Sequence, residues 1–525
     1  MKRIITALAV IVAMTACNQN PFLSEWDTPY GIPPFDKIHV SDYVPAVKYG
    51  IRQQSAEIDA IILNSEEPTF ENVVAAYDRS GAVLGKVQSV LFNLSESDGT
   101  DALIKVVEEV TPMLSEHSDN IFMNRFFFEK VKAVYDKRES LGLTVEQNTY
   151  LKDLYDSFIQ NGVALDEDAQ AKLRDVNTEL SNLYLQFGNN LLAESNAFTA
   201  EFGMSVSEYY PFMGRSEDRK LREKVFKAYS NRGNNGNEYD NKAVVEKIMK
   251  LRIERANILG FATPAEMILE NTMAKKSSAV DSFLAEIMDA AVARAKEEVA
   301  DMQVVMDKDI AAGLLPAGST IQPWDYLYYS ERVRKERFDL DEEQYKPYFK
   351  MENVRKGVFD NASRLYGLKF KPVTGVALYN PEAEAFEVTD ADGSLIGVII
   401  TDYYPRPIKR GGAWMSNFTD QYIADGVNVR PVIVNIGNFT KPTEDTPSLL
   451  TLDEVETMFH EFGHALHGLL SQCTYRGTSG TNVKRDFVEL PSQINENWAF
   501  QKEVLATYAF HYETGEVIPD DLVDK

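Results

Sequence analysis

The chain of 525 residues contains 44% hydrophobic and 26% charged residues and carries a formal net charge of -26. This composition is typical of a globular protein, and the length is sufficient to build a sizeable hydrophobic core. The acidic balance argues against a nucleic-acid-binding protein, because contact with phosphate groups requires basic patches. It does not define the charge of a substrate, since the need for solubility explains an acidic surface equally well.

The N-terminus has the pattern of an export signal. Lys2 and Arg3 precede an apolar run over residues 4–14, which is too short to cross a membrane, and Met-Thr-Ala stands directly before Cys17. This arrangement resembles the lipobox of bacterial lipoproteins, in which the cysteine is lipidated. We expect residues 1–16 to be a lipoprotein signal peptide, and the mature protein to be an exported periplasmic or cell-envelope lipoprotein that contacts the membrane through its lipid only. The alternative is an ordinary signal peptide that contains a cysteine.

Beyond this segment, the chain is predicted to be mainly α, because apolar residues recur at helical spacing in long charged stretches. These stretches cover residues 40–64, 144–198, 217–259 and 277–306. Within the third stretch, residues 231–238 are rich in Gly and Asn and are predicted to form a polar loop.

A small β region is expected after these helices. Residues 385–388 and 395–401 flank Asp390-Ala-Asp-Gly393, which is a hairpin signal. Residues 429–435 form another candidate strand, ahead of a helix that carries most of the histidines.

His460-Glu-Phe-Gly-His464 is the most informative pattern of the chain. Two imidazoles four residues apart lie on one face of a helix and can reach a single metal ion. Glu461 projects beside them and can accept a proton from metal-bound water. With His467, three of the six histidines fall within eight residues. The pattern predicts a zinc-dependent hydrolase.

A catalytic zinc ion usually has three protein ligands and one open position. A third histidine at the spacing of the long His-x-x-Gly-x-x-His pattern is excluded, because Leu470 occupies that place. An acidic residue on a following helix is the natural candidate. Residues 486–498 are predicted to form such a helix with Asp486 as its N-cap. Spacing alone does not choose between Glu489 and Glu496 as the ligand.

Two segments carry a resemblance to a known family. Residues 456–468, followed by Asp486-Phe-Val-Glu-Leu-Pro-Ser-Gln and Trp498, resemble the thimet oligopeptidase family of zinc metallopeptidases. Within this family they are most similar to the bacterial dipeptidyl carboxypeptidases, or peptidyl-dipeptidases. The resemblance runs from about residue 20 to the last residue, and three further segments agree with it: residues 33–38, 412–417 and 438–442.

The resemblance implies that His460, His464 and Glu489 bind one Zn²⁺ per chain and that Glu461 is the general base. It thereby favours Glu489 over Glu496 as the third ligand.

Three nearby residues are left for other roles. Glu496 and Glu456 become candidates for orienting the ring N–H groups of the zinc ligands, although ordinary surface carboxylates fit their positions equally well. His467 is expected to be structural or to face the substrate, because a fourth protein ligand would close the position that water needs.

The family implies a helical, two-lobed ellipsoid with a deep channel, zinc at its floor, and the small β region near the zinc helix. Such a channel admits short unfolded peptides and excludes folded proteins. We expect a tether over residues 17–35, an N-terminal helical region over 36–230 and the metallopeptidase catalytic region over 231–525. The expected activity is the release of C-terminal dipeptides, with an endo-acting oligopeptidase as the alternative. Nothing in the sequence indicates the oligomeric state.

The chain departs from the family near its end. Members carry a downstream segment rich in Tyr and Gly, with a His and Tyr residues that contact the substrate, and this sequence shows no such segment. Gly515 is predicted to end a helix, and residues 518–521 to begin one, barely a turn before Lys525. We therefore expect a C-terminally truncated sequence. If the chain truly ends at Lys525, the alternative is a non-catalytic, lipid-anchored protein that retains zinc and binds peptides.

Overall fold

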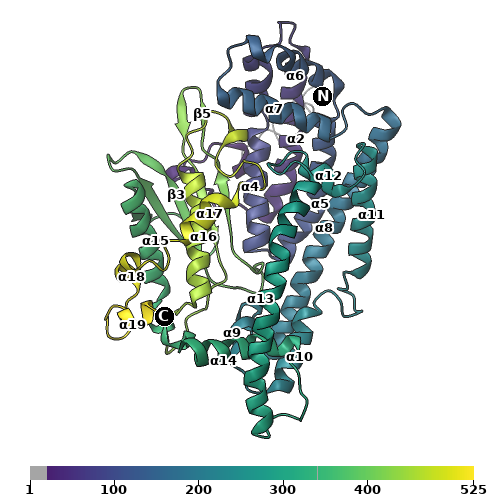
Figure 1. The fold of residues 1–525 in the computed structure, drawn as a ribbon. Coiled ribbons are helices and arrows are strands. Elements are labelled where there is room, and N and C mark those ends of the chain that lie inside the picture. The colour runs from purple at the N-terminus through teal and green to yellow at the C-terminus, as the bar shows by residue number, and fades with distance from the viewer. Residues whose placement is uncertain (1–19, 340) are drawn as a thin grey trace, which may run out of the picture.

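The computed structural model describes residues 20–339 and 341–525 (Figure 1). The predicted signal peptide and Cys17 lie outside the described residues. From Asn20 onward, the segment expected to be a tether packs on the body of the protein. Phe22 is fully buried and lies against Tyr43, with ring centroids 5.1 Å apart. The Asn20 side chain donates a hydrogen bond to the backbone oxygen of Asp42, at 2.8 Å.

Several helices of the first half begin at residues whose side chains cap the free backbone N–H groups. Thr144 and Gln147, for example, exchange side-chain-to-backbone hydrogen bonds at the start of one helix, which is a capping box. The helices are α2 (Val40–Leu63), α3 (Ala76–Arg79), α4 (Ala82–Ser97), α5 (Asp101–Phe122), α6 (Arg125–Lys137), α7 (Val145–Gln160), α8 (Glu167–Phe202), α9 (Tyr209–Arg215), α10 (Arg219–Ser230) and α11 (Lys242–Ile258). Helices α5, α6, α7, α8 and α10 are among those capped in this way.

The second half contains the sheet and the helices that pack on it. The helices are α12 (Pro264–Leu269), α13 (Ser277–Ala311), α14 (Tyr326–Phe338), α15 (Met351–Tyr366), α16 (Leu452–Leu469), α17 (Glu489–Glu496), α18 (Lys502–Tyr508) and α19 (Asp520–Val523). The strands are β1 (Lys369–Pro372), β2 (Glu384–Thr389), β3 (Leu395–Asp402), β4 (Trp414–Thr419), β5 (Tyr422–Ala424), β6 (Val427–Val429) and β7 (Val432–Ile436).

The mainly α fold is confirmed, with differences in where the predicted helices end. The stretch over 144–198 is two helices rather than one, because Gly162 adopts a φ of +85° and Asp166 caps the new start of α8. The polar loop over 231–238 separates α10 from α11, as predicted. Gly515 does not end a helix: α18 already stops at Tyr508, and Gly515 lies in a turn that closes a short antiparallel bridge. The predicted division at residue 230 stays a prediction.

The sheet has the order β1-β2-β3-β7-β4, and the predicted hairpin is its β2–β3 pair. β3 and β7 pair in parallel at its centre and are buried on both faces. Alternate residues therefore enter two different cores: Ile399 and Ile433 face one, while Val398 and Ile400 face the other. Helices α2, α4 and α5 contribute to the second core.

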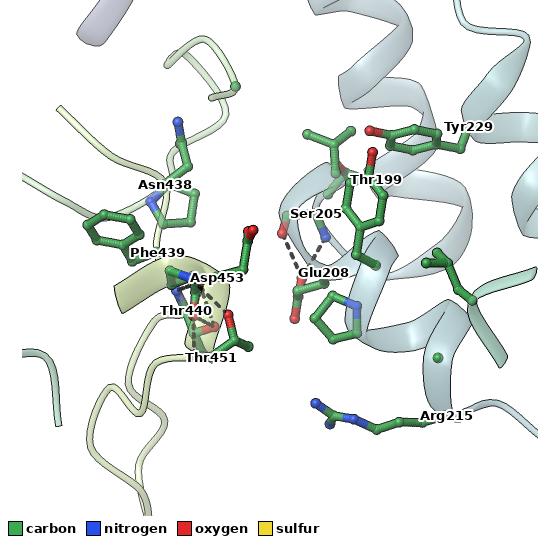
Figure 2. Close-up of a pocket in the computed structure, with 18 of the residues that line it drawn as sticks. Thr199, Ser205, Glu208, Arg215, Tyr229, Asn438, Phe439, Thr440, Thr451 and Asp453 are labelled. Atoms are coloured by element: carbon green, nitrogen blue, oxygen red, sulfur yellow. Dashed lines mark hydrogen bonds between the residues drawn. The ribbon is translucent and has the colours of Figure 1, made fainter. Parts of the chain in front are cut away.

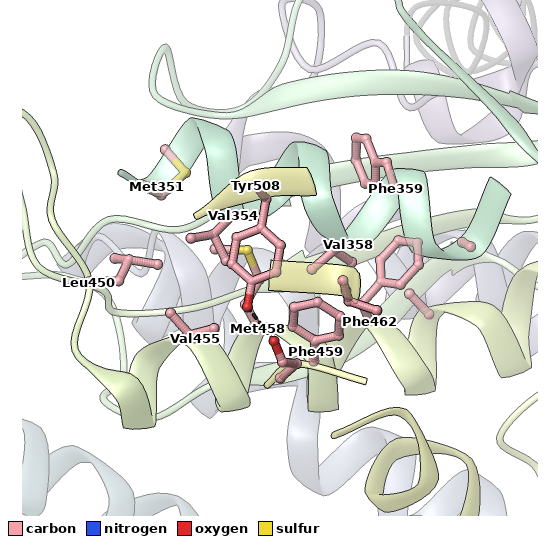
Figure 3. Close-up of a cluster of buried hydrophobic side chains, with 14 of the residues drawn as sticks. Met351, Val354, Val358, Phe359, Leu450, Val455, Met458, Phe459, Phe462 and Tyr508 are labelled. Atoms are coloured by element: carbon pink, nitrogen blue, oxygen red, sulfur yellow. Dashed lines mark hydrogen bonds between the residues drawn. The ribbon is translucent and has the colours of Figure 1, made fainter. Parts of the chain in front are cut away.

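The first core joins the sheet to α15, α16 and α18 (Figure 3). Apolar residues on one face of α16, among them Met458, Phe459 and Phe462, lie against the face of α15 that carries Val358. Tyr508 of α18 is inserted between the two helices and donates its hydroxyl proton to the backbone oxygen of Ala499. The α16 helix is therefore packed on its apolar side, so its polar side is the one available for chemistry.

In Figure 1 the sheet with α15 to α18 lies on one side of the molecule, and the long helices α8, α11 and α13 lie on the other. Among the described residues, no helix combines the length and the apolar character that crossing a membrane requires.

Helix α17 packs on α16 with almost no space between the two backbones. A Cβ atom on Gly463 of α16 would lie 2.6 Å from the Cα of Ser492 and 2.8 Å from the backbone oxygen of Pro491. Both neighbours are backbone atoms, which cannot rotate away as a side chain can. Only glycine fits this position without moving one helix.

We therefore expect Gly463→Ala to lower the free energy of unfolding by about 1–3 kcal/mol, the usual range for overpacking. Denaturant unfolding measures the effect. Gly85→Ala is the matched control: Gly85 is also inside a helix, α4, and an added Cβ there meets nothing within 4 Å. The control should be neutral or stabilising by up to about 1 kcal/mol. Equal effects of both substitutions would contradict the role assigned to the close contact.

Candidate metal centre

The start of α16 is fixed by a partly buried carboxylate. Glu454 accepts hydrogen bonds from the backbone N–H of Thr451, at 2.9 Å, and of Thr440, at 2.6 Å, while the Thr451 hydroxyl accepts one from the Glu454 N–H. This capping box satisfies donors that the first helical turn leaves free. It also attaches the helix to the segment that follows β7.

The middle of α16 is held by two buried asparagines. Asn435 of β7 donates from its side chain to the backbone oxygen of Glu461, at 2.8 Å, and accepts the hydroxyl proton of Tyr403, at 3.0 Å. Asn495 of α17 donates to the backbone oxygen of Phe459, at 2.6 Å. Sequence reasoning did not single out these residues. The available signal was Asn435 itself, a polar residue within the apolar strand Val-Ile-Val-Asn-Ile.

Three side chains converge between α16 and α17. The Oε2 atom of Glu489 lies 3.2 Å from Nε2 of His460 and 3.0 Å from Nε2 of His464. All three ligand atoms lie within 4.8 Å of one another. With metal–ligand bonds of about 2.0–2.2 Å, the ligand atoms of a tetrahedral zinc ion are separated by roughly 3.3–3.6 Å. Small movements would therefore let these three atoms bind one ion. The residues present fit a zinc ion.

The carboxylate of Glu489 is kept available for a cation. Burial raises its pKa, but the Ser492 hydroxyl, which donates to Oε2 at 2.9 Å, and the neighbouring imidazoles of His464 and His460 lower it, and the net shift is downward. An ionised carboxylate is the form that binds a metal.

Of the two glutamates considered as partners of the imidazoles, one makes the contact. Oε1 of Glu496 lies 2.6 Å from Nδ1 of His460, so that a proton on Nδ1 leaves Nε2 free to face Glu489. Glu456 is exposed, and within the described part of the chain no hydrogen bond joins it to His460. Nδ1 of His464 is buried and has no hydrogen-bond partner among the described residues.

Glu461 is buried from solvent beside the three converging side chains. Its residue is 7% exposed, and its Oε2 atom has no hydrogen-bond partner in the described parts of the chain. Burial raises the pKa of this carboxyl group to about 7, with the nearby Glu489 adding to the effect and His460 opposing it. A proton acceptor with a pKa near neutrality is well matched to proton transfer at neutral pH.

The structure separates His467 from this group. It lines a smaller cavity of about 460 Å³ with apolar residues of α16 and α17, among them Leu466 and Ile494. Burial lowers the pKa of its imidazole, and its Nδ1 has no hydrogen-bond partner in the part of the chain that the structure describes. A packing role for His467 fits this position.

The predicted capping role of Asp486 is wrong. Helix α17 begins at Glu489, and Val488 occupies the N-cap position without a side-chain hydrogen bond. The Asp486 carboxylate instead accepts the backbone N–H groups of Met273 and Ala274, each at 2.9 Å. A capping pattern cannot reveal a partner more than two hundred residues away.

A large cavity of about 2390 Å³ opens beside the first turns of α16 (Figure 2). Its lining reaches Thr457, three residues before His460, but does not include the three converging side chains. The metal site was expected at the cavity floor; the cavity instead ends about one helical turn short of it. The walls that face each other in Figure 2 carry Asn438, Thr440, Thr451 and Asp453 on one side, and Thr199, Glu208, Arg215 and Tyr229 on the other.

The fold and this site define a class of protein. Two imidazoles and a carboxylate around one point, with a second, buried carboxyl group beside them and a large cavity nearby, are the parts of a metal-dependent hydrolase. The sequence profile of Peptidase family M3 matches residues 212–525, more than half of the chain. The chain therefore belongs to peptidase family M3, and it is a metallopeptidase.

Named relatives agree with this assignment. The chain is 38% identical to the dipeptidyl carboxypeptidase of Escherichia coli strain K12, over 97% of this chain and 78% of the relative. It is 31% identical to oligopeptidase A of Salmonella typhimurium, over 96% of this chain and 78% of that relative. The solved structure described as PZ peptidase A with inhibitor 2 shares the fold, with a TM-score of 0.51 at 13% identity, over 90% of this chain and 71% of that one.

Proposed function

We propose that this metallopeptidase uses one zinc ion per chain, bound by His460, His464 and Glu489, to hydrolyse short peptides. The observation that carries the proposal is the approach of the Glu489 Oε2 atom to both Nε2 atoms, at 3.2 and 3.0 Å. Two imidazoles and a carboxylate are a donor set that suits zinc. The contact of Glu496 with His460 supports it, because a carboxylate behind a ligating imidazole is a common feature of zinc sites.

Glu461 is the proposed general base. Zinc in this position would supply the Lewis acidity that acidifies water and polarises a peptide carbonyl. Glu461 accepts the proton of the attacking water and later delivers it to the nitrogen of the leaving amine. Its burial supports both roles, as does its Oε2 atom, which has no hydrogen-bond partner among the described residues. A raised pKa lets one carboxyl group take up and release a proton near pH 7.

The proposed activity is release of dipeptides from the C-termini of short, unfolded peptides. Support comes from the 38% identity to a relative named dipeptidyl carboxypeptidase, compared with 31% to a relative named oligopeptidase A. The latter likeness keeps an endo-acting oligopeptidase as the second candidate. A cavity of about 2390 Å³ has room for a short peptide of either kind but not for a folded protein.

Glu461→Gln should separate chemistry from metal binding. We expect the rate of peptide cleavage to fall by about 10²–10⁴-fold or more, because the amide cannot accept the proton, while the variant still binds one zinc ion per chain. Cleavage rates and metal content measure the two effects. Glu503→Gln, at an exposed glutamate of α18, is the matched control and should retain activity. Cleavage that survives a chelator, or survives Glu461→Gln, would show that the mechanism is wrong.

A pair of peptides distinguishes the two activities. For a peptide with a free C-terminus, we expect mass spectrometry to detect successive loss of dipeptides. The same peptide with an amidated C-terminus should remain intact, because a dipeptide-releasing enzyme recognises the terminal carboxylate. Cleavage of the amidated peptide at internal bonds would favour the endo-acting oligopeptidase.

The same proposal includes export and lipidation at Cys17. Its support is the sequence alone: the charged start, the short apolar run and Met-Thr-Ala before the cysteine. The mature protein is then a periplasmic or cell-envelope lipoprotein that contacts the membrane through its acyl chains. Cys473 is left without a second cysteine for a disulfide.

Cys17→Ser tests this part of the proposal. We expect the wild-type protein to fractionate with membranes and to incorporate a labelled fatty acid, and the variant to lose both properties. Cys473→Ser is the control and should behave as wild type. A Cys17→Ser variant that still sediments with membranes and still carries the label would contradict lipidation at this residue.

A further inference from the structure

The segment between α16 and α17 carries a carboxylate whose partners lie in a remote loop. Oδ1 of Asp486 accepts the N–H of Met273, and Oδ2 accepts the N–H of Ala274, each at 2.9 Å. The loop bends tightly around this carboxylate: Lys275 adopts a φ of +62°, and its N–H donates to the Thr272 hydroxyl at 3.2 Å. These hydrogen bonds lower the pKa of Asp486, so the carboxylate is charged at neutral pH.

Asp486 is linked rigidly to Glu489. The N–H of Phe487 donates to the backbone oxygen of Lys484, and the N–H of Leu490 donates to that of Phe487, both at 2.9 Å. Two successive turns therefore connect the remote contact to the first residue of α17. The Lys484 side chain donates a hydrogen bond to Asn271 of the same loop and another to Asp153 of α7, the latter at 2.8 Å.

A second support of the first turn of α17 lies within the helix: the Ser492 hydroxyl donates to the backbone oxygen and to the Oε2 atom of Glu489, each at 2.9 Å. The N-cap position of α17 makes no side-chain hydrogen bond, and Pro491 lacks a backbone N–H. The close contacts of α17 with α16 lie at Pro491 and Ser492, which face Gly463, and at Asn495, so they begin two residues after Glu489. The position of Glu489 therefore depends both on this packing and on the segment that precedes it in the chain.

The remote loop leads directly into α13, which packs against α14, and residues of α14 line the large cavity. In Figure 1, α13 lies on the side of the molecule away from the sheet, so Asp486 joins the segment before Glu489 to that side.

We propose that Asp486 is a positioning residue: by binding the backbone N–H groups of Met273 and Ala274, it holds the first turn of α17 so that Glu489 reaches the metal site. The contact makes the third ligand dependent on the placement of the loop that leads into α13. This inference rests on the proposed function, because it takes Glu489 as a metal ligand.

The test compares Asp486→Ala and Asp486→Asn in the full chain. We expect the zinc affinity of Asp486→Ala, measured by competition with a chelating dye, to fall roughly tenfold or more, the effect seen when a support of a metal ligand is removed. The visible absorption spectrum of the cobalt-substituted protein should change, because one ligand is displaced. In turnover, kcat should fall while KM stays constant. Asp486→Asn keeps one acceptor oxygen and should be intermediate, and it provides the measurement if the alanine variant does not fold.

Asp392→Ala is the matched control. Asp392 is also an exposed carboxylate that accepts a backbone N–H, that of Ser394 at 2.8 Å, but it lies in the β2–β3 turn. It should leave zinc affinity and the cobalt spectrum unchanged. Folded Asp486 variants with wild-type affinity and spectrum would overturn the inference, and so would an equal loss in Asp392→Ala. Glu489→Gln separates this from the proposed function: if it binds zinc as tightly as wild type, the metal site itself is wrong.

Discussion

The close packing of α17 on α16 is the constraint on which the site depends. Glu489 can reach the two imidazoles because Gly463 lets the two backbones approach to a distance at which no side chain fits. Hydrogen bonds from two buried asparagines hold the helices in this arrangement. Asn435 fixes α16 to the sheet, and Asn495 fixes α17 to α16. Buried amide groups of this kind define the relative position of the helices as well as stabilising them, because a shift of either helix leaves a polar group without a partner.

Rigid surroundings also explain the electrostatics of the site. The apolar core behind α16 excludes water from Glu461, and this exclusion raises its pKa. Glu489 experiences the opposite balance, since a hydroxyl group and two imidazoles face it and lower its pKa. Two carboxyl groups that both interact with the His460 imidazole therefore favour different forms, one suited to carry a proton and one suited to bind a cation.

Local parts of this structure were predictable, whereas parts that depend on distant contacts were not. The pair His460 and His464 follows from helical geometry alone, and the β2–β3 hairpin follows from its turn residues. The choice of Glu489 over Glu496 needed a family resemblance, because an irregular segment separates the two helices and spacing carries no information across it. Asp486 was misassigned for the same reason: its partners are backbone groups of a loop that precedes α13. Contacts between backbone amides and a remote side chain leave no pattern in the sequence.

The packing of the first described residues limits how far the body of the enzyme could lie from a membrane to which it is anchored. Asn20 is already bonded to α2, and Phe22 is fully buried. If a lipid is attached at Cys17, three residues of extended chain allow a separation of at most about 11 Å between that cysteine and Asn20. The body would then lie against the lipid headgroups with little freedom to tumble. Peptides would reach the cavity along the membrane surface or from the side that faces away from it.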